Sequence, residues 1–226
     1  MESFDHIFKR ASERKGGSRQ LESLLSQPKT SDQLAAIDDS RFLAEFSKKV
    51  FQSGFVWRVV EQKWPNFEDS FWQFNIDKLL MMPPDMLEQK AQDPKIIRNF
   101  KKVKTIIDNA HMIKLAASKH GSFSTMVADW PTTDIIGLWL YLKKEGNRLG
   151  GNTGPYALRS IGKDTFLLSR DVEAYLRGHQ LIEGGLSSLR SLNAIQACFN
   201  EWQQQSGRSL QELSQIIAYS CGDNYV

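Results

Sequence analysis

The sequence predicts an all-α protein built from many short helices. Apolar residues recur every three or four positions along most of the chain, as Phe42, Phe46 and Val50 do, and this spacing places them on one face of a helix. Residues that often cap helices precede many of these runs. No run shows the alternation of apolar and polar residues that is typical of a strand, and the chain contains no internal repeat.

Length and composition are those of an ordinary globular chain. Its 226 residues can bury a core as one domain or as two packed lobes. The net charge of +3 means that any surface for a polyanion must be a local patch. The two cysteines, Cys198 and Cys221, belong to no Cys-x-x-Cys or Cys/His cluster, which favours a reducing compartment and argues against structural zinc. No apolar run reaches the length of a membrane span, and the acidic start is not a signal peptide, so we expect a cytoplasmic protein that does not bind membranes.

Residues 1–35 are interpreted as a polar N-terminal arm, ordered or frayed, ahead of a helical domain over 36–226. Such an arm could touch a polyanion, although runs of charge are more often solvated surface. Its basic residues are Lys9, Arg10, Arg14, Lys15 and Arg19.

Capping and helix-breaking residues set the expected boundaries of the helices. Asp38 to Ser40 start a helix that Gly54 can end, Asp93-Pro94 opens a longer one, and Ser209 to Glu212 form a capping box before a last short helix. The other signals are Asp77, Pro83-Pro84, Asp85, Ser122, Thr132-Thr133 and Ser169-Arg170-Asp171.

An aromatic-rich segment follows the first long helix. Most of its members must be core, because aromatic side chains dominate burial, but such a cluster beside a turn can also form a slot for a planar ligand. The sequence leaves both interpretations open. The residues are Trp57, Trp64, Phe67, Phe71, Trp72 and Phe74.

A glycine-rich turn joins two helices over about residues 134–160. Gly146 ends the first, and Gly154-Pro155 starts the second, so the pair forms a helix–hairpin–helix. Backbone amides in such a loop can approach a phosphate closely, and nearby cations add reach. The alternative is that the glycines only turn the chain between two packed helices. The candidate DNA-binding residues are Lys144, Arg148, Gly150, Gly151, Asn152, Thr153 and Gly154.

Three blocks in this order resemble the 3-methyladenine DNA glycosylase I family, within the helix–hairpin–helix DNA glycosylase superfamily. The first block is Gln52-Ser53-Gly54-Phe55-Val56-Trp57 with its aromatic sequel. The second block is Ile96-Ile97-Arg98-Asn99 followed by Lys102-Val103 and Ile106 to Ala110. The third is the hairpin from Leu142 through Thr153 to Tyr156. The resemblance covers roughly residues 40–175 and implies a bundle of the glycosylase type.

The resemblance also implies a reaction and a partner. Such an enzyme flips a damaged purine out of double-stranded DNA, stacks it on aromatic side chains and cleaves its N-glycosidic bond. For this chain we expect no cofactor or metal. Trp57 matches the family's stacking tryptophan, and a cationic alkylated purine would gain cation–π attraction there. A buried core tryptophan is the alternative. Phe55 and Gln52 are further pocket candidates, and we expect a monomer associated with the nucleoid.

Some residues depart from the family pattern. The family's pocket glutamate falls at Lys49, which would repel a cationic purine. The family's N-terminal Cys-Gly-Trp and Tyr-His stretch and its zinc ligands have no counterparts in this sequence. These departures put specificity for 3-methyladenine in question.

Asp171 is the candidate catalytic carboxylate. Much of the superfamily has an aspartate at a helix start some twenty residues beyond the hairpin, and Asp171 resembles it. It could stabilise an oxocarbenium-like sugar or orient a water. Alternatively, it only interacts favourably with the helix dipole.

Three hypotheses follow for the function. The first is a monofunctional base-excision glycosylase for alkylated or otherwise modified purines such as 3-methyladenine. The second is a catalytically inactive helix–hairpin–helix protein that binds lesions or abasic sites. The third is a helical protein that keeps only the fold and does not bind DNA.

Overall fold

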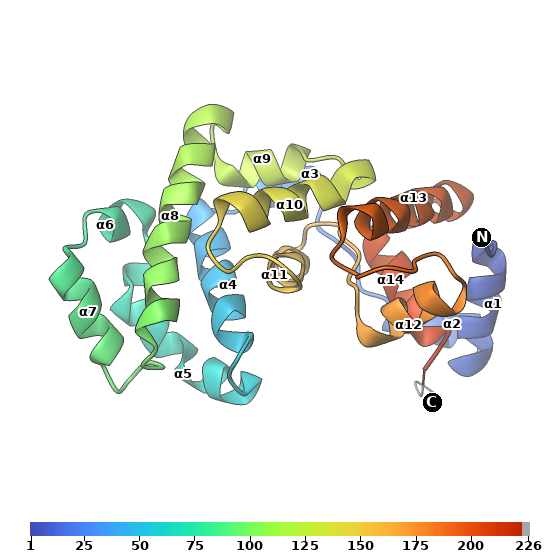
Figure 1. Ribbon diagram of the computed structural model, residues 1–226, viewed down its shortest axis with the longest axis horizontal. Helices are drawn as coiled ribbons and strands as arrows, with labels where there is room; N and C mark the ends of the chain where they lie inside the picture. Colours follow the sequence, from blue (N-terminus) through green and yellow to red (C-terminus); the bar gives the residue numbers. More distant parts are fainter. Residues whose placement is uncertain (223–226) are drawn as a thin grey trace. The chain divides into compact units, whose positions relative to one another are not determined.

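The computed structural model describes residues 1–222 and consists of helices and the turns that join them (Figure 1). The all-α class is confirmed, since no strand occurs in these residues. The α-helices are α1 (Phe4–Arg14), α2 (Ser18–Leu24), α3 (Ser31–Ala35), α4 (Asp39–Gln52), α5 (Trp57–Ser70), α6 (Ile76–Leu80), α7 (Pro84–Gln92), α8 (Phe100–His120), α9 (Phe123–Asp129), α10 (Ile135–Glu145), α11 (Thr153–Ile161), α12 (Arg170–Gly178), α13 (Leu189–Ser206) and α14 (Leu210–Tyr219). Two short 3-10 helices are η1 (Trp72–Phe74) and η2 (Thr132–Asp134).

The contacts within the chain divide it into two units. Unit 1 comprises Met1–Lys29, Pro131–Gly137 and the described residues from Gly162 onward. Unit 2 comprises Thr30–Trp130 and Leu138–Ile161. This division differs from the expected arm over 1–35 and domain over 36–226, because the first 29 residues group with the C-terminal helices.

The N-terminal segment of unit 1 has a buried apolar face. Phe4, Ile7 and Ala11 on α1 are buried, and so is Leu21 on α2. Helix α1 packs against α13 and α14. The spacing of three and four residues between the buried positions of α1 is that of one helix face. This face accounts for the segment's place in unit 1.

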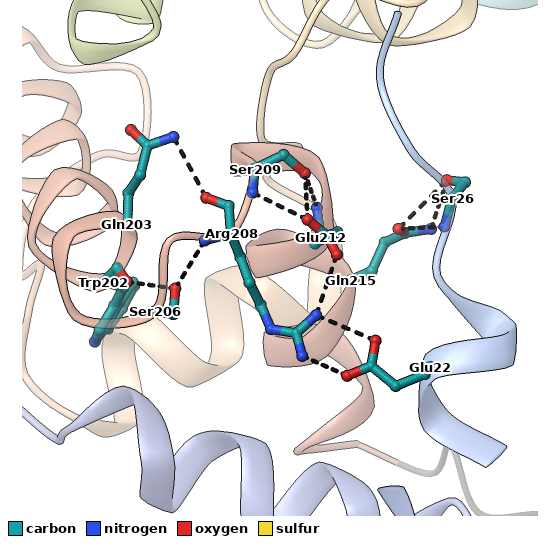
Figure 2. A network of polar contacts seen from close by, with 9 residues as sticks. All are labelled: Glu22, Ser26, Trp202, Gln203, Ser206, Arg208, Ser209, Glu212 and Gln215. Atoms are coloured by element: carbon teal, nitrogen blue, oxygen red, sulfur yellow. Dashed lines mark hydrogen bonds and ion pairs between the residues drawn. The ribbon is translucent and has the colours of Figure 1, made fainter. Parts of the chain in front are cut away.

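A polar network in unit 1 is centred on Arg208, between α13 and α14 (Figure 2). Its guanidinium forms an ion pair with Glu22 and donates to a carboxylate oxygen of Glu212 at 3.1 Å. The expected capping box of α14 is confirmed, since Ser209 and Glu212 each accept from the other's backbone N–H. The network therefore joins the start of α14 to α2.

The core of unit 2 is built around α4, which packs against α8, α9 and α11. Phe42 and Phe46 are buried and present their rings edge-on to Phe123, with centroids 5.4 and 5.7 Å away. In the aromatic-rich segment, Phe67, Phe71 and Phe74 are fully buried, as the core interpretation predicted. These contacts hold α4 and α5, the two helices that carry the candidate pocket residues.

Helix α8 begins at Phe100, so the prediction that Asp93-Pro94 opens it is wrong. The ammonium of Lys63 donates to the carbonyls of residues 94–96 at 2.7, 3.3 and 3.2 Å. Because a side chain from α5 satisfies these carbonyls, the segment does not need helical hydrogen bonds. Asn99 then caps α8 with its side chain.

Three of the other predicted N-caps occur in the structure. Asp38, Ser122 and Ser169 are confirmed as N-caps of α4, α9 and α12, each accepting a hydrogen bond from a backbone N–H of its helix. Thr132-Thr133 lies in η2 instead, and α10 starts at Ile135.

Candidate functional site

Lys102 on α8 holds the end of α4 in unit 2. Its side chain is buried, and its ammonium donates to the carbonyl of Val50 in the last turn of α4. Burial lowers the pKa of this ammonium, and the charge of Arg148 lowers it further. The same ammonium lies 5.7 Å from the centre of the Phe55 ring. Through these contacts Lys102 fixes the turn that leads from α4 into α5.

Trp57 is the first residue of α5 and stands out from the aromatic residues around it. It is 54% exposed, whereas Phe67, Phe71 and Phe74 are fully buried. A large aromatic ring left this open is unusual for a residue that serves only packing. The alternative that Trp57 is a buried core tryptophan is therefore excluded.

Lys49 on α4 places a positive charge against the Trp57 ring. Its ammonium lies 5.3 Å from the ring centroid, within the range of a cation–π interaction. The side chain of Lys49 is only 12% exposed. Its ammonium is 3.3 Å from a carboxylate oxygen of Glu45, one helical turn earlier, and donates to the amide oxygen of Gln52 at 3.0 Å.

Gln52 continues this polar chain towards α5. Its amide nitrogen donates to Glu61 at 2.8 Å, and the other carboxylate oxygen of Glu61 pairs with Lys48 at 2.7 Å. Gln52 is buried, so these two hydrogen bonds satisfy an amide that would otherwise be costly to bury. The hydrogen bond between Lys49 and Gln52 holds Lys49 in a defined position beside the tryptophan.

A cavity of about 520 Å³ opens between these residues and the hairpin, all within unit 2. A volume of this size is within the range of small-molecule sites. Its lining residues are Lys49, Gln52, Ser53, Trp57, Gly150, Gly151, Asn152, Thr153 and Tyr156. The cavity thus brings together three of the four predicted pocket residues and four of the predicted hairpin residues. Phe55 packs against Phe51 and Lys102 instead.

The hairpin itself is a close-packed turn between α10 and α11. The backbone N–H of Gly154 donates to the carbonyl of Leu149 at 3.1 Å, and Leu149 is buried. A Cβ at Gly154 would lie 2.5 Å from that carbonyl oxygen, so only glycine fits there. Gly151 has φ +60° and open space around it. Arg148 and Lys144 are exposed beside the turn.

Asn109 on α8, which was not selected as a site residue, holds the hairpin through two hydrogen bonds. It is fully buried, accepts from the backbone N–H of Asn147 at 2.7 Å and donates to the carbonyl of Asn147 at 3.2 Å. A buried asparagine in the middle of an apolar helix is the signal that could have marked it. Ser53 and Tyr156 are further lining residues that had not been selected for the site.

The segment that carries Lys49, Gln52 and Trp57 is similar to a known family. Residues 33–139, which are 107 of the 226 residues, match a family model described as methyladenine glycosylase. The match contains α4, α5 and α8, hence Lys49, Gln52, Trp57 and Lys102. The chain matches no sequence among curated proteins.

Solved structures of DNA glycosylases are similar to this chain. A 3-methyladenine DNA glycosylase I is 26% identical, with 61% of this chain and 82% of that chain covered and a TM-score of 0.47. The enzyme of the same name from Staphylococcus aureus is 19% identical, with 68% and 91% covered and a TM-score of 0.50. The 8-oxoguanine DNA glycosylase of Methanocaldococcus jannaschii is 14% identical, with 96% and 94% covered and a TM-score of 0.57. The latter two structures, both under 25% identical, show that the chain has the fold of these glycosylases.

The match over residues 33–139 supports a DNA glycosylase of base-excision repair, an enzyme that acts on DNA. Within residues 1–222, no group of three or more His, Cys, Asp and Glu side chains could hold a metal ion. No helix in that range is both long enough and apolar enough to cross a membrane.

The candidate catalytic residue Asp171 lies in unit 1, in the first turn of α12. The N-cap of this helix is Ser169, whose hydroxyl accepts from the backbone N–H of Val172 at 3.3 Å. Asp171 is half-buried, and its backbone carbonyl accepts from the Cys221 thiol at 3.2 Å. A carboxylate at this position of a helix has favourable electrostatics whatever its further role. Its catalytic role therefore stays a prediction.

Proposed function

We propose that this glycosylase hydrolyses the N-glycosidic bond of an alkylated or otherwise modified purine that is flipped out of duplex DNA into the cavity beside Trp57. The observation that carries the proposal is the half-exposed Trp57 ring on a cavity that the hairpin loop also lines. An enzyme that acts on a base must remove it from the stack, and an open aromatic face replaces the lost stacking.

The hairpin supplies the contacts to the DNA backbone in this proposal. Loop amides at Gly150 to Gly154 approach a phosphate, and the exposed Lys144 and Arg148 add positive charge. Contacts of this kind position the protein on the duplex and do not read its sequence. The bound lesion would then be selected at the cavity. We further propose that the protein acts as a monomer.

We assign the catalytic carboxylate to Asp171. A carboxylate there would stabilise positive charge that develops on the sugar, or would orient the attacking water. The products would be a free base and an intact strand with an abasic site. Neither a metal nor another cofactor would take part.

The experiment that tests the proposal is release of free base from duplexes carrying modified purines, measured with a chelator present. We expect release by the wild-type chain and at least roughly a hundredfold slower release by Asp171→Asn, with unchanged duplex affinity. Equal release by the two proteins would remove Asp171 from the mechanism. Salt-dependent duplex binding with no release by the wild type would favour a lesion-binding protein instead.

A further inference from the structure

The Trp57 ring, beside which a flipped base would stack, is in contact with a cation. The Lys49 ammonium lies 5.3 Å from the centre of the ring, and its side chain is only 12% exposed. Glu45 and Gln52 fix its direction, with distances of 3.3 and 3.0 Å to the ammonium. The positive charge is therefore part of the wall of the cavity.

The charge balance of the cavity depends on this one residue. Of the lining residues, all of them in the described part of unit 2, only Lys49 carries a charge. The nearby carboxylates have partners of their own, since Glu45 pairs with Lys49, and Glu61 pairs with Lys48 while accepting from Gln52. A ligand in the cavity therefore meets an ammonium rather than a carboxylate.

This arrangement sets the kind of base that the cavity can hold. A purine nucleoside alkylated at N3 or N7 carries a positive charge, which Lys49 repels at short range. The cation–π attraction that such a base would gain from Trp57 is already used by the lysine. A lysine ammonium has three N–H donors, and the contacts to Glu45 and Gln52 account for two. The third can donate to an oxygen of a bound base.

We propose that Lys49 makes the cavity selective for an electrically neutral modified purine with an exocyclic carbonyl oxygen, and against cationic alkylated purines. Lys49 would donate to that oxygen while the base stacks at Trp57. The inference rests on the proposed function, because it assumes that the flipped base occupies this cavity. The inference narrows the class of modified purines that the proposed function leaves open.

The test compares two modified guanines that differ in charge, 8-oxoguanine, which is neutral, and 7-methylguanine, which is cationic as the nucleoside. Each is placed in the same duplex, as the 2′-fluoro nucleoside for binding and as the ordinary deoxynucleoside for base release. The variants are Lys49→Met, which removes the charge, and Lys49→Glu, which reverses it. Lys48→Met is the matched control, because Lys48 pairs with Glu61 and does not line the cavity. Affinity for undamaged duplex confirms that each variant folds.

We expect the wild type and Lys48→Met to bind the 8-oxoguanine duplex at least roughly tenfold more tightly than the 7-methylguanine duplex. Lys49→Met should lose this preference, and Lys49→Glu should reverse it. Equal affinities in the wild type, or a preference that Lys49→Met leaves unchanged, would overturn the inference. Release of free base by the wild type would in that case still support the proposed function. Binding selectivity that depends on Lys49, without release of either base, would support the inference and contradict the proposed catalysis.

Discussion

Two charged clusters, one in each unit, differ in what they contact. In unit 1, Arg208 pairs with Glu22, which is far away in the sequence, and with Glu212 four residues later. In unit 2, Lys49 pairs with Glu45 and stands at the wall of an open cavity, against a half-exposed tryptophan. The first arrangement ties segments of the fold together, and the second presents a charge to a ligand. Substitution of Arg208 should therefore change stability, and substitutions around the cavity should change DNA binding and base release.

The largest effect is expected from Gly154→Ala in the hairpin of unit 2. The added Cβ would lie 2.5 Å from the Leu149 carbonyl oxygen and 3.2 Å from the Leu142 side chain, so the turn must move. We expect the free energy of unfolding to fall by about 2–4 kcal/mol, because a close-packed backbone contact is broken. Duplex affinity should fall at least roughly tenfold as the loop amides lose their positions.

Gly178→Ala in unit 1 is the matched control for that substitution. A Cβ at Gly178 meets no atom within 4 Å, and the residue ends α12. The free energy of unfolding of Gly178→Ala, measured in urea, should equal that of the wild type or exceed it by up to about 1 kcal/mol. If Gly154→Ala had the same stability and duplex affinity as Gly178→Ala, the claim that close packing at Gly154 positions the loop would be contradicted.

A smaller effect, confined to stability, is expected from Arg208→Ala in unit 1. Two carboxylates would lose their common partner, and the free energy of unfolding should fall by about 2 kcal/mol. Duplex affinity should remain that of the wild type. The exposed Arg19 provides the control, since Arg19→Ala should change stability by less than about 0.5 kcal/mol. Urea unfolding with a duplex titration measures both quantities.

The smallest effect concerns pH and the contact of Glu2 with Arg10. The Arg10 guanidinium donates to both carboxylate oxygens at 2.7 and 2.9 Å and lowers the pKa of Glu2 to about 2. A carboxyl group with a lowered pKa stabilises the folded state above its unfolded pKa, and this stabilisation is lost as the pH falls from about 4.5 towards 2. With solvent screening, we expect it to amount to about 1 kcal/mol at pH 6.

Urea unfolding of Glu2→Gln at pH 6 and pH 3 checks this prediction. The variant should lose less stability between the two pH values than the wild type does. Glu13→Gln, at an exposed position of α1, should keep the pH dependence of the wild type. Identical pH dependence in the wild type and Glu2→Gln would mean that the Arg10 contact contributes nothing.

The all-α fold and the hairpin could be predicted from the sequence, because helix caps and the Gly146 to Gly154 turn are local signals. The start of α8 could not, because residues 94–96 are satisfied by Lys63, some thirty positions away. The polar composition of the N-terminal arm gives no local sign that it groups with the C-terminal helices in unit 1. The apolar face formed by Phe4, Ile7 and Ala11 is only a few residues wide.

The candidate site was predicted in part. Trp57 and the glycines of the loop came from motifs, and the structure places Trp57, Gly150 and Gly151 around one cavity. The position of Lys49 against the Trp57 ring depends on the angle between α4 and α5, which no local pattern encodes. The bracing of the hairpin by Asn109 likewise joins segments 38 positions apart.

The most direct test of the cavity is release of free base by Trp57→Ala and Trp57→Phe compared with the wild type. We expect Trp57→Ala to slow release by about tenfold to a hundredfold, since stacking on an aromatic ring contributes about 1–3 kcal/mol per base. Trp57→Phe keeps an aromatic face and should retain most of the activity. Release by Trp57→Ala at the wild-type rate would contradict the claim that the flipped base stacks at Trp57.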